Sequence, residues 1–431
     1  MHLFRTILKT VVAKGAGSVI SFLIVLISAR LMGGADGRGA ISLMVLNITV
    51  ILLVNDLIGG GALVFLIPRH PLPNLVIPSW LWGIGCGTVL PILFYVFGGY
   101  NRSEYIYLTA LSIFLNLSSI NAVVLNGKEK IKAGNIIALT QVIILLILLS
   151  IFVFIRGWKK PEAYYLALLI SYIISFLMSL SIIRKGLQER RTGNYKRMMK
   201  QMIRSGFYVQ FGNAVQLMNY RVSFYMLNFF FPLQGKALVG IYSTGASVCE
   251  SVWVISNGIS MVQYARISNM SNRKDAQELS AGLSKISLLA TCAAMIVLIL
   301  LPASFFGAVF GPEYIPLHHL ILLLSAGICV FGLSCIYSHY FSGIGKMHVS
   351  SYSSLAGFVI TLLAGFILIP RYGINGAAVT ACCSYLASAL FLLIRFKKES
   401  GQGYSELLFS YGSIFSFLKE SPAHVRNQRN H

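Results

Sequence analysis

Hydrophobic residues gather along this chain into long continuous runs, which short polar segments separate. Each run is close to the roughly 20 residues that an α-helix needs to cross the hydrocarbon core of a bilayer. The strands of a membrane β-barrel would alternate polar and apolar residues over about ten positions, and these runs do not alternate. The pattern predicts twelve membrane-spanning helices, near residues 10–32, 40–67, 75–98, 105–125, 133–155, 163–183, 206–231, 239–263, 283–310, 317–342, 350–369 and 375–396.

The composition also indicates an integral membrane protein. Of the 431 residues, 56% are hydrophobic and 11% are charged, whereas about 25% of the residues in soluble domains are charged. Most of the 35 Lys and Arg residues fall in every second loop, and loops with such an excess lie on the cytoplasmic side. We therefore predict that both termini are cytoplasmic. Anionic lipid headgroups would balance the net charge of +22, so we expect no nucleic-acid partner.

The sequence contains no pattern typical of a bound cofactor. Its seven cysteines all lie in hydrophobic runs, without the spacing of metal ligands. No nucleotide-binding motif is present, which argues against direct use of ATP. We predict neither a metal site nor a cofactor.

A basic segment, residues 184–204, divides the predicted helices six and six. We predict an N-terminal lobe over residues 1–190, a C-terminal lobe over residues 191–398 and a cytoplasmic tail over residues 399–431. The apolar part of the tail is too short to cross a bilayer, which favours an interfacial helix. The basic segment is interpreted as a lipid-facing linker, with a regulatory or partner-binding site as the alternative.

The two halves share short glycine-containing segments, as expected of a transporter built from related halves. These are GRGAISL (37–43) with LVGIYST (238–244), which aligns Gly39 with Gly240, and LNGKEKIKAGN (125–135) with FSGIGKMHVSS (341–351), which aligns Gly127 with Gly343. Both members of each pair fall on the same predicted side of the membrane. The pattern therefore predicts a parallel repeat.

Among the ionisable side chains inside predicted spans, four matter most for function: Lys14, Asp56, Arg221 and Glu250. A charge at mid-helix costs roughly 2.5–3.5 kcal/mol on insertion scales, so each is a candidate functional residue. Arg221 lies too deep to reach the interface easily. It either lines a cavity or forms a structural ion pair with Glu250 or Asp56. The two carboxylates serve either as partners of a cation or as a proton or sodium site, and Lys14 lies close enough to one helix end to snorkel.

Polar side chains also gather on single faces of two predicted helices. A polar face of this kind is expected to line a cavity or a closely packed neighbour rather than lipid. The first set is Gln210, Asn213, Arg221 and Asn228, and the second is Ser243, Glu250, Trp253 and Asn257.

Several segments together resemble a known family. They are ARLMGGADGRGAISL (29–43), NGKEKIKAGN (126–135), FGPEYIPLHHLILLLSAG (310–327), SGIGKMH (342–348) and PRYGINGAAVTACCSYL (370–386). The combination resembles the polysaccharide-export branch of the MOP superfamily, which includes flippases for O-antigen and other lipid-linked oligosaccharides. Lipid II flippases and MATE exporters are more distant relatives. The resemblance covers roughly residues 5–398, and it implies an all-α fold of twelve helices in two six-helix lobes around a central cavity, working by alternating access.

This resemblance and the polar helix faces predict a flippase for a polyprenyl-pyrophosphate-linked oligosaccharide. It would move its substrate from the inner to the outer leaflet of a bacterial inner membrane, for surface polysaccharide assembly. The planar fork of an arginine matches phosphate oxygens in pairs, so we expect Arg221, together with Lys14, to hold the pyrophosphate. The residues expected to contact sugar or line the cavity are Gln210, Asn213, Asn228, Asn257, Tyr220 and Trp253.

Other functions stay open at this stage. The main alternative is a cation-coupled multidrug exporter of the MATE type, although a buried arginine repels cationic drugs. A membrane-bound oligosaccharide ligase or polymerase usually has a large outer loop, whereas the longest one predicted here is residues 156–163, so we predict no enzyme. A non-catalytic scaffold is a further alternative. The expected partners are the lipid-linked oligosaccharide, the bilayer and polysaccharide polymerase machinery, with H+ or Na+ as the candidate coupling ion at Asp56 or Glu250.

Overall fold

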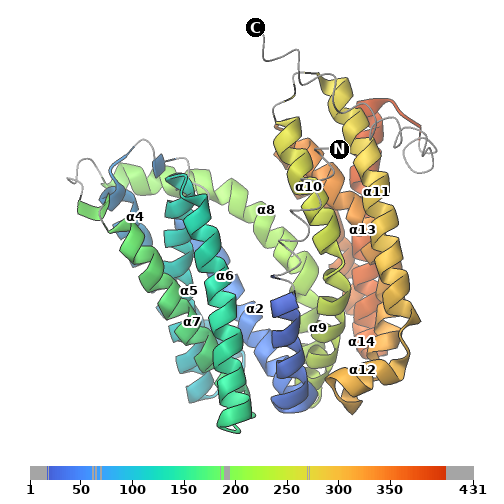
Figure 1. The fold of residues 1–431 in the computed structure, drawn as a ribbon, viewed down its shortest axis with the longest axis horizontal. Helices are drawn as coiled ribbons and strands as arrows, with labels where there is room; N and C mark the ends of the chain where they lie inside the picture. The colour runs from blue at the N-terminus through green and yellow to red at the C-terminus, as the bar shows by residue number, and fades with distance from the viewer. Residues whose placement is uncertain are drawn as a thin grey trace. The chain divides into compact units, whose positions relative to one another are not determined.

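The computed structural model describes residues 17, 19–60, 63, 66–67, 70–184, 186–188, 195–268, 270 and 272–403. Every regular element in these ranges is a helix, and no β-strand occurs among them (Figure 1). The predicted all-α fold class is therefore confirmed. Lys14 and the predicted interfacial helix of the tail lie outside the described residues.

The chain divides into two compact units. The first unit comprises Leu23–Ala214, and the second contains the described chain from Val215 onward. The division falls inside α8 (Tyr195–Phe230), so this one helix contributes to both units. The lobe boundary that we predicted between residues 190 and 191 falls on residues that the structure does not describe, and it stays a prediction.

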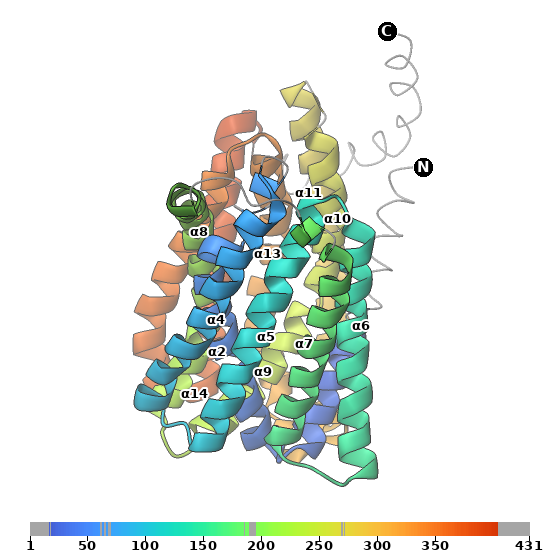
Figure 2. The ribbon, with the colours of Figure 1, turned by 90° about the vertical axis from the view of Figure 1, so that its left-hand side faces the viewer.

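The first unit is organised around α5 (Arg102–Gly127). This helix packs against α2 (Gly34–Gly59), α4 (Leu72–Phe97), α6 (Ile131–Ser150) and α7 (Pro161–Ile183) (Figure 2). The π-helix η2 (Ile151–Ile155) continues α6, and the 3-10 turn η3 (Gly186–Gln188) follows α7. Asparagine amides join the helices of this unit, since Asn116 donates to the Gly83 carbonyl (2.9 Å) and Asn121 donates to Ser179 Oγ (2.9 Å). Such interhelical hydrogen bonds are typical of packing within membranes.

The second unit is organised around α13 (Leu317–Gly343). This helix packs against α9 (Gly235–Glu250), α10 (Trp253–Ile267), α11 (Arg273–Leu300) and α14 (Met347–Ser400). The short helix α12 (Ala303–Phe310) and the 3-10 turn η4 (Pro312–Tyr314) lie between α11 and α13 in the chain (Figure 1).

Helix α14 consists of two antiparallel halves, residues 347–372 and 374–400. Gly373 has a non-helical conformation with φ +55°, in the left-handed region that glycine adopts at little cost. The Ser353 and Ser388 hydroxyls each donate to the other residue's carbonyl, at 2.9 Å and 3.2 Å. The chain therefore turns back at Gly373, at the turn that the segment PRYGINGAA (370–378) predicted.

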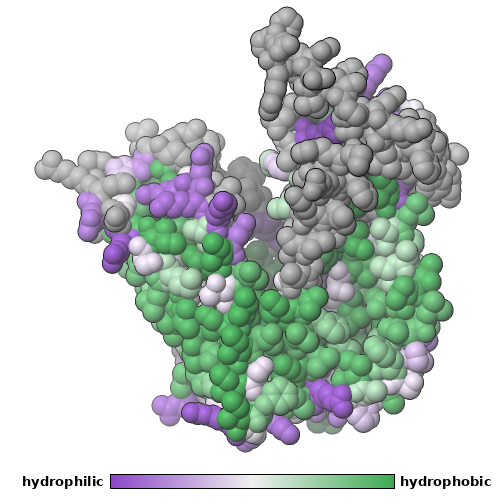
Figure 3. Space-filling view, viewed as in Figure 1, coloured by the Kyte–Doolittle hydropathy of each residue, from purple (hydrophilic) through white to green (hydrophobic). Residues whose placement is uncertain are grey.

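Eight helices in the described part of the chain are long and apolar enough to cross a membrane, or nine if α9 and α10 form one bent span. This number treats α14 as one helix, and the helix over Val19–Leu31 is too short to be included. The count of twelve spans stays a prediction. Figure 3 shows hydrophobic side chains along the flanks of the helices and hydrophilic side chains gathered toward their ends, as expected for a protein in a bilayer.

The local geometry of the two units repeats where the sequence alignment predicted it. Helices α2 and α9 begin at Gly34 and Gly235, and both open with the same backbone hydrogen bond. The Gly37 N–H donates to the Gly33 carbonyl (3.2 Å), and the Leu238 N–H donates to the Gln234 carbonyl (3.0 Å). These positions have the same spacing as Gly39 and Gly240 in the alignment.

The second aligned pair also matches. Helices α5 and α13 end at Gly127 and Gly343, and each is followed by the same turn. The Lys130 N–H donates to the Leu125 carbonyl (2.8 Å), as the Lys346 N–H donates to the Phe341 carbonyl (2.7 Å). The turn contains a left-handed residue in both cases, Glu129 (φ 57°) and Gly345 (φ 81°). Equal hydrogen bonds at equal spacing support a parallel internal repeat.

Candidate functional site

The candidate site lies where the span formed by α9 and α10 is broken. The axes of the two helices differ by 46° across Ser251 and Val252. Backbone hydrogen bonds of the 3-10 type, between residues three apart, replace α-helical ones here. One example runs from the Val252 N–H to the Cys249 carbonyl (3.2 Å). Broken helices of this kind form substrate or ion sites in many transporters.

Serine and threonine side chains are the local feature that can bend the chain here, since no proline or glycine lies at residues 246–254. Hydroxyls that donate to a carbonyl three or four residues earlier compete with the backbone and bend helices. Four such donors occur along α9 and at its end: Ser243, Thr244, Ser247 and Ser251. The bend places Glu250, the last residue of α9, beside α8.

Arg221 and Glu250 form a two-pronged ion pair at this break. Arg221 Nη1 donates to Glu250 Oε1 (2.8 Å), and Nη2 donates to Oε2 (2.7 Å). Parallel charge-assisted hydrogen bonds of this kind fix both side chains in one geometry. The structure therefore selects Glu250 from the two carboxylates that we considered as partners for Arg221.

The ion pair is shielded but remains partly accessible. The side chains of Arg221 and Glu250 are 27% and 15% exposed. The Tyr385 hydroxyl donates to Glu250 Oε1 (3.4 Å), and the Arg221 guanidinium lies 5.3 Å from the ring centre of Phe224. A guanidinium near an aromatic face gains a further favourable interaction. Part of the Arg221 side chain therefore remains accessible beside the ion pair.

Four aromatic rings pack next to the ion pair, and they come from four helical segments. Tyr220 lies on α8, Trp253 on α10, Phe331 on α13 and Tyr385 on the second half of α14. All six centre-to-centre distances between the rings fall between 4.5 Å and 6.0 Å. Trp253 is 7% exposed, and its indole N–H donates to the Ile328 carbonyl (3.2 Å). Tyr220 is half-buried and is the most accessible member of the cluster.

The polar residues that we predicted to share one cavity fall in both compact units. In the first unit, Asn213 on α8 donates to Gln210 Oε1 (3.1 Å), and Gln210 is buried against Gly60 at the end of α2. Asp56 lies one turn before Gly60 and accepts a hydrogen bond from Asn55 (3.0 Å). The structure thus places Gln210 near Asp56 within the first unit.

The remaining predicted residues have more peripheral positions within the second unit. The side-chain carbonyl of Asn228 lies against Gly235 at the start of α9, which is typical of a packing contact between adjacent segments. Asn257 is half-buried on α10, one turn after Trp253. Their predicted roles in sugar binding stay predictions.

Two residues of the site were missed by the sequence analysis. Tyr385 contacts both Glu250 and the aromatic cluster, although it is 135 residues from Glu250 in the chain. Asn219, two residues before Arg221, accepts hydrogen bonds from Thr361 Oγ1 (2.8 Å) and Ser384 Oγ and so ties α8 to both halves of α14. Asn219 lies about 160° around the helix from Arg221 and therefore off the polar face that we searched, and nothing local in the sequence connects Tyr385 with Glu250.

One helix begins earlier than the sequence analysis predicted. The hydrophobic pattern predicted a span over residues 283–310, whereas α11 begins at Arg273, so Lys285 lies well inside this helix and is only 2% exposed.

In the described part of the chain, no group of three or more His, Cys, Asp or Glu side chains is arranged to hold a metal ion. The arrangement at α9 and α10 is instead one of paired charge and aromatic surface. It suits an anionic ligand with a polar, ring-shaped portion, because arginine binds oxyanions and aromatic rings stack on sugars and other rings.

Sequence comparisons connect the chain with proteins of glycan synthesis. No family model matches it. It is 27% identical over 174 residues to a capsular polysaccharide biosynthesis protein of Staphylococcus aureus, covering 38% of this chain and 43% of that protein. It is 22% identical over 231 residues to a probable low-salt glycan biosynthesis flippase of Haloferax volcanii, covering 48% of this chain and 49% of that protein. The chain spans about half the length of the curated relatives it matches.

Solved structures share the fold over nearly the whole chain. An inward-facing multidrug-resistance MATE family transporter of the MOP superfamily matches with a TM-score of 0.67 at 13% identity, covering 88% of this chain and 98% of that one. The lipid II flippase MurJ in an inward closed conformation matches with a TM-score of 0.66 at 15% identity, covering 96% and 93% of the two chains.

Proposed function

We propose that this chain is a flippase for a lipid-linked oligosaccharide. It is a multi-span membrane protein with the fold of the MOP-superfamily transporters, as its sequence predicted. Its substrate would be a polyprenyl-pyrophosphate-linked glycan. Alternating access would move this substrate from the inner to the outer leaflet of a bacterial inner membrane, where surface polysaccharide is assembled. The names of the sequence relatives, which concern capsular polysaccharide and glycan flipping, support this substrate class.

The Arg221–Glu250 pair is the observation that carries the proposal. Both terminal nitrogens of Arg221 face a carboxylate at 2.7–2.8 Å, and two oxygens of a phosphate can take the same positions. Pyrophosphate would replace Glu250 when substrate binds, and Glu250 would return when it leaves. The arginine then has an anionic partner in both states, which avoids the cost of an unpaired charge inside a membrane. Lys14 is proposed as a second cation for the pyrophosphate.

The sugar would lie against the aromatic cluster. Tyr220 offers a partly exposed ring next to Arg221 in the chain, so a glycan attached to a pyrophosphate on Arg221 would lie close to it. Trp253 would contact sugar only after the cluster rearranges, since its ring is packed in the present arrangement. The polar cavity residues proposed beside them are Gln210, Asn213, Asn228 and Asn257.

Membrane voltage favours export of such a substrate. Two negative charges that cross an inside-negative potential outward gain roughly 4.6 kcal/mol per 100 mV, at about 2.3 kcal/mol for each charge. A coupling ion would add to this driving force. Asp56 is our candidate for H+ or Na+ coupling, because it lies within α2 and its carboxylate is half-buried with Asn55 as its neutral partner. Transport requires no catalytic step, and polysaccharide polymerase machinery is the proposed partner on the receiving side.

Complementation of a bacterial strain that lacks this gene tests the assignment. We expect Arg221→Gln to abolish surface polysaccharide and Arg221→Lys to restore part of it, because lysine keeps the charge but loses the fork. Arg156→Gln is the matched control, since Arg156 is exposed and follows η2 outside the site. Normal surface polysaccharide with Arg221→Gln, at wild-type protein level, would refute the proposal.

A cation-coupled multidrug exporter is the second candidate, and the structural similarity to a MATE transporter favours it. A cationic drug would need a free carboxylate in the site, whereas Glu250 is neutralised by Arg221. Efflux of cationic dyes from cells that express the chain, together with unchanged glycolipid flipping, would support this candidate over ours.

A further inference from the structure

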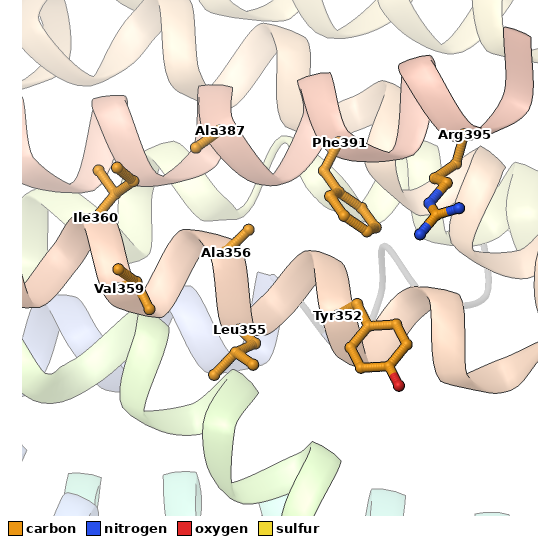
Figure 4. Close-up of a pocket in the computed structure, with 8 residues that line it drawn as sticks. All are labelled: Tyr352, Leu355, Ala356, Val359, Ile360, Ala387, Phe391 and Arg395. Atoms are coloured by element: carbon orange, nitrogen blue, oxygen red, sulfur yellow. The ribbon is translucent and has the colours of Figure 1, made fainter. Parts of the chain in front are cut away.

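A second candidate binding site lies on the second unit, between the two halves of α14. It is a groove of about 810 Å³ lined by Tyr352, Leu355, Ala356, Val359 and Ile360 from the first half and by Ala387, Phe391 and Arg395 from the second. The two stretches each span eight residue steps, or about 12 Å of helix. Figure 4 shows Arg395 and Tyr352 at one end of the groove and Ile360 with Ala387 toward the other.

The groove is open and largely apolar. Tyr352, Leu355 and Val359 are 53%, 37% and 45% exposed. The neighbouring side chains Leu390 and Ile394 are exposed as well, which is expected for a surface in contact with lipid. The two small residues Ala356 and Ala387 leave the space that larger side chains would fill. A flexible hydrocarbon chain fits a surface of this kind.

The open end of the groove carries a positive charge. The Arg395 guanidinium lies 5.5 Å from the ring centre of Phe391, a contact that holds it over the groove. Among the residues that the structure describes, no carboxylate forms an ion pair with Arg395. Lys398, exposed on the same helix end, does not line the groove. An anion at this end would therefore meet a cation whose charge is not already compensated.

The position of Arg395 along α14 matches the depth of lipid phosphates. The second half of α14, residues 374–400, contains 27 residues and is about 40 Å long. The hydrocarbon core is about 30 Å thick, so the last turns of the helix extend into the headgroup region. Arg395 lies five residues before the end of α14, and the lysines beyond it are typical of the interface.

We propose that this groove binds an anionic glycerophospholipid of the surrounding bilayer. One acyl chain lies along Ala356 and Ala387, and the lipid phosphate contacts Arg395. The site is separate from the Arg221–Glu250 pair, and it does not depend on which substrate the protein transports. A lipid in this position would pack the two halves of α14 together on the face where their own side chains leave space.

Lipid retention by the purified full-length protein tests this proposal. The protein is exchanged into mixed micelles with equal amounts of phosphatidylglycerol and phosphatidylcholine, and native mass spectrometry measures which lipid stays bound. We expect the wild type to retain phosphatidylglycerol preferentially. One charge-assisted contact between a guanidinium and a lipid phosphate changes binding by about five-fold, so Arg395→Gln should lower the ratio of bound phosphatidylglycerol to phosphatidylcholine by about this factor.

Two variants separate the groove from general surface charge. Lys398→Gln removes one exposed charge from the same helix end outside the groove, and we expect it to keep the wild-type ratio. Ala387→Leu fills the groove without changing charge, and we expect it to lower the amount of bound phosphatidylglycerol. Size-exclusion elution and helical circular dichroism, both like the wild type, show that each variant is folded.

Other outcomes would overturn the proposal. An unchanged lipid ratio in Arg395→Gln, or an equal loss in Arg395→Gln and Lys398→Gln, means that no specific phosphate site exists at this groove. Added polyprenyl phosphate could instead displace phosphatidylglycerol from the wild type but not from Ala387→Leu. This result means that the tail of an isoprenoid lipid is the occupant. A dimer that Ala387→Leu dissociates means that a second copy of the chain covers the groove.

Discussion

Replacement of Glu250 by glutamine isolates the charge of the ion pair, because the amide keeps the shape of the carboxylate. Glu250→Gln leaves the Arg221 guanidinium positive and without its anionic partner. We expect this variant to be less stable than the double variant Arg221→Gln/Glu250→Gln, in which both charges are gone. A charge that has lost its partner inside a membrane protein costs more than a neutral pair of similar size.

The size of this effect follows from the burial of the two side chains. Loss of one partner costs about 3–5 kcal/mol for a fully buried pair and about 0–1 kcal/mol for an exposed pair. The side chains of Arg221 and Glu250 are 27% and 15% exposed, between these limits. We therefore expect Glu250→Gln to lower the free energy of unfolding by about 2 kcal/mol and the double variant to lower it by about 1 kcal/mol or less.

A double-mutant cycle measures this difference. The free energy of unfolding is determined in detergent micelles for the wild type, for Glu250→Gln, for Arg221→Gln and for the double variant. We expect a coupling energy of about 3 kcal/mol, which should hold at high salt because the pair is shielded. Effects that add within about 0.5 kcal/mol would mean that the two residues do not depend on each other, and the exchange of pyrophosphate with Glu250 would then lose its basis.

Two further predictions test other parts of the structure. Asp56→Asn should remove the response of glycolipid flipping in vesicles to an imposed pH gradient but keep the response to voltage. The control is Asp36→Asn, an exposed position on the same helix. A response to pH that persists in Asp56→Asn excludes Asp56 as the proton site. Gly357→Ala should lower the free energy of unfolding by about 1–3 kcal/mol, because a Cβ there would overlap Ser388 Oγ and the Asn219 amide. Gly85→Ala, with no atom within 4 Å of the new Cβ, should instead stabilise the protein by about 0.4–1 kcal/mol, and the reverse order in denaturant titrations would contradict the packing described here.

The internal repeat shows that a comparison of short sequence segments can indicate similar local backbone geometry. The alignment of Gly39 with Gly240 and of Gly127 with Gly343 predicted a parallel repeat, and the starts of α2 and α9 and the ends of α5 and α13 lie at matching positions in it. Helix starts and turns depend on residues within a few positions of each other, so their signals are present in short segments. The matching turn hydrogen bonds follow from the same local cause.

The break between α9 and α10 shows where prediction from sequence fails. The hydrophobic pattern over residues 239–263 predicted one continuous helix, because a run of apolar residues looks the same in a straight and in a bent membrane span. The hydroxyls that can bend the chain were present in the sequence. Serine and threonine also occur in straight membrane helices, however, and whether they bend one depends on the surrounding packing.

The sequence by itself determined that this chain is an all-α membrane protein with a repeated architecture and an arginine within a span, because hydrophobic burial and turn geometry are encoded locally. Only the tertiary structure decided which partner that arginine has. Glu250 and Asp56 were equivalent candidates in the sequence, and the structure pairs Arg221 with Glu250 at the bend after α9. The same holds for Tyr385 and for the groove along α14, since contacts between distant residues depend on how helices pack and not on the residues nearby in the chain.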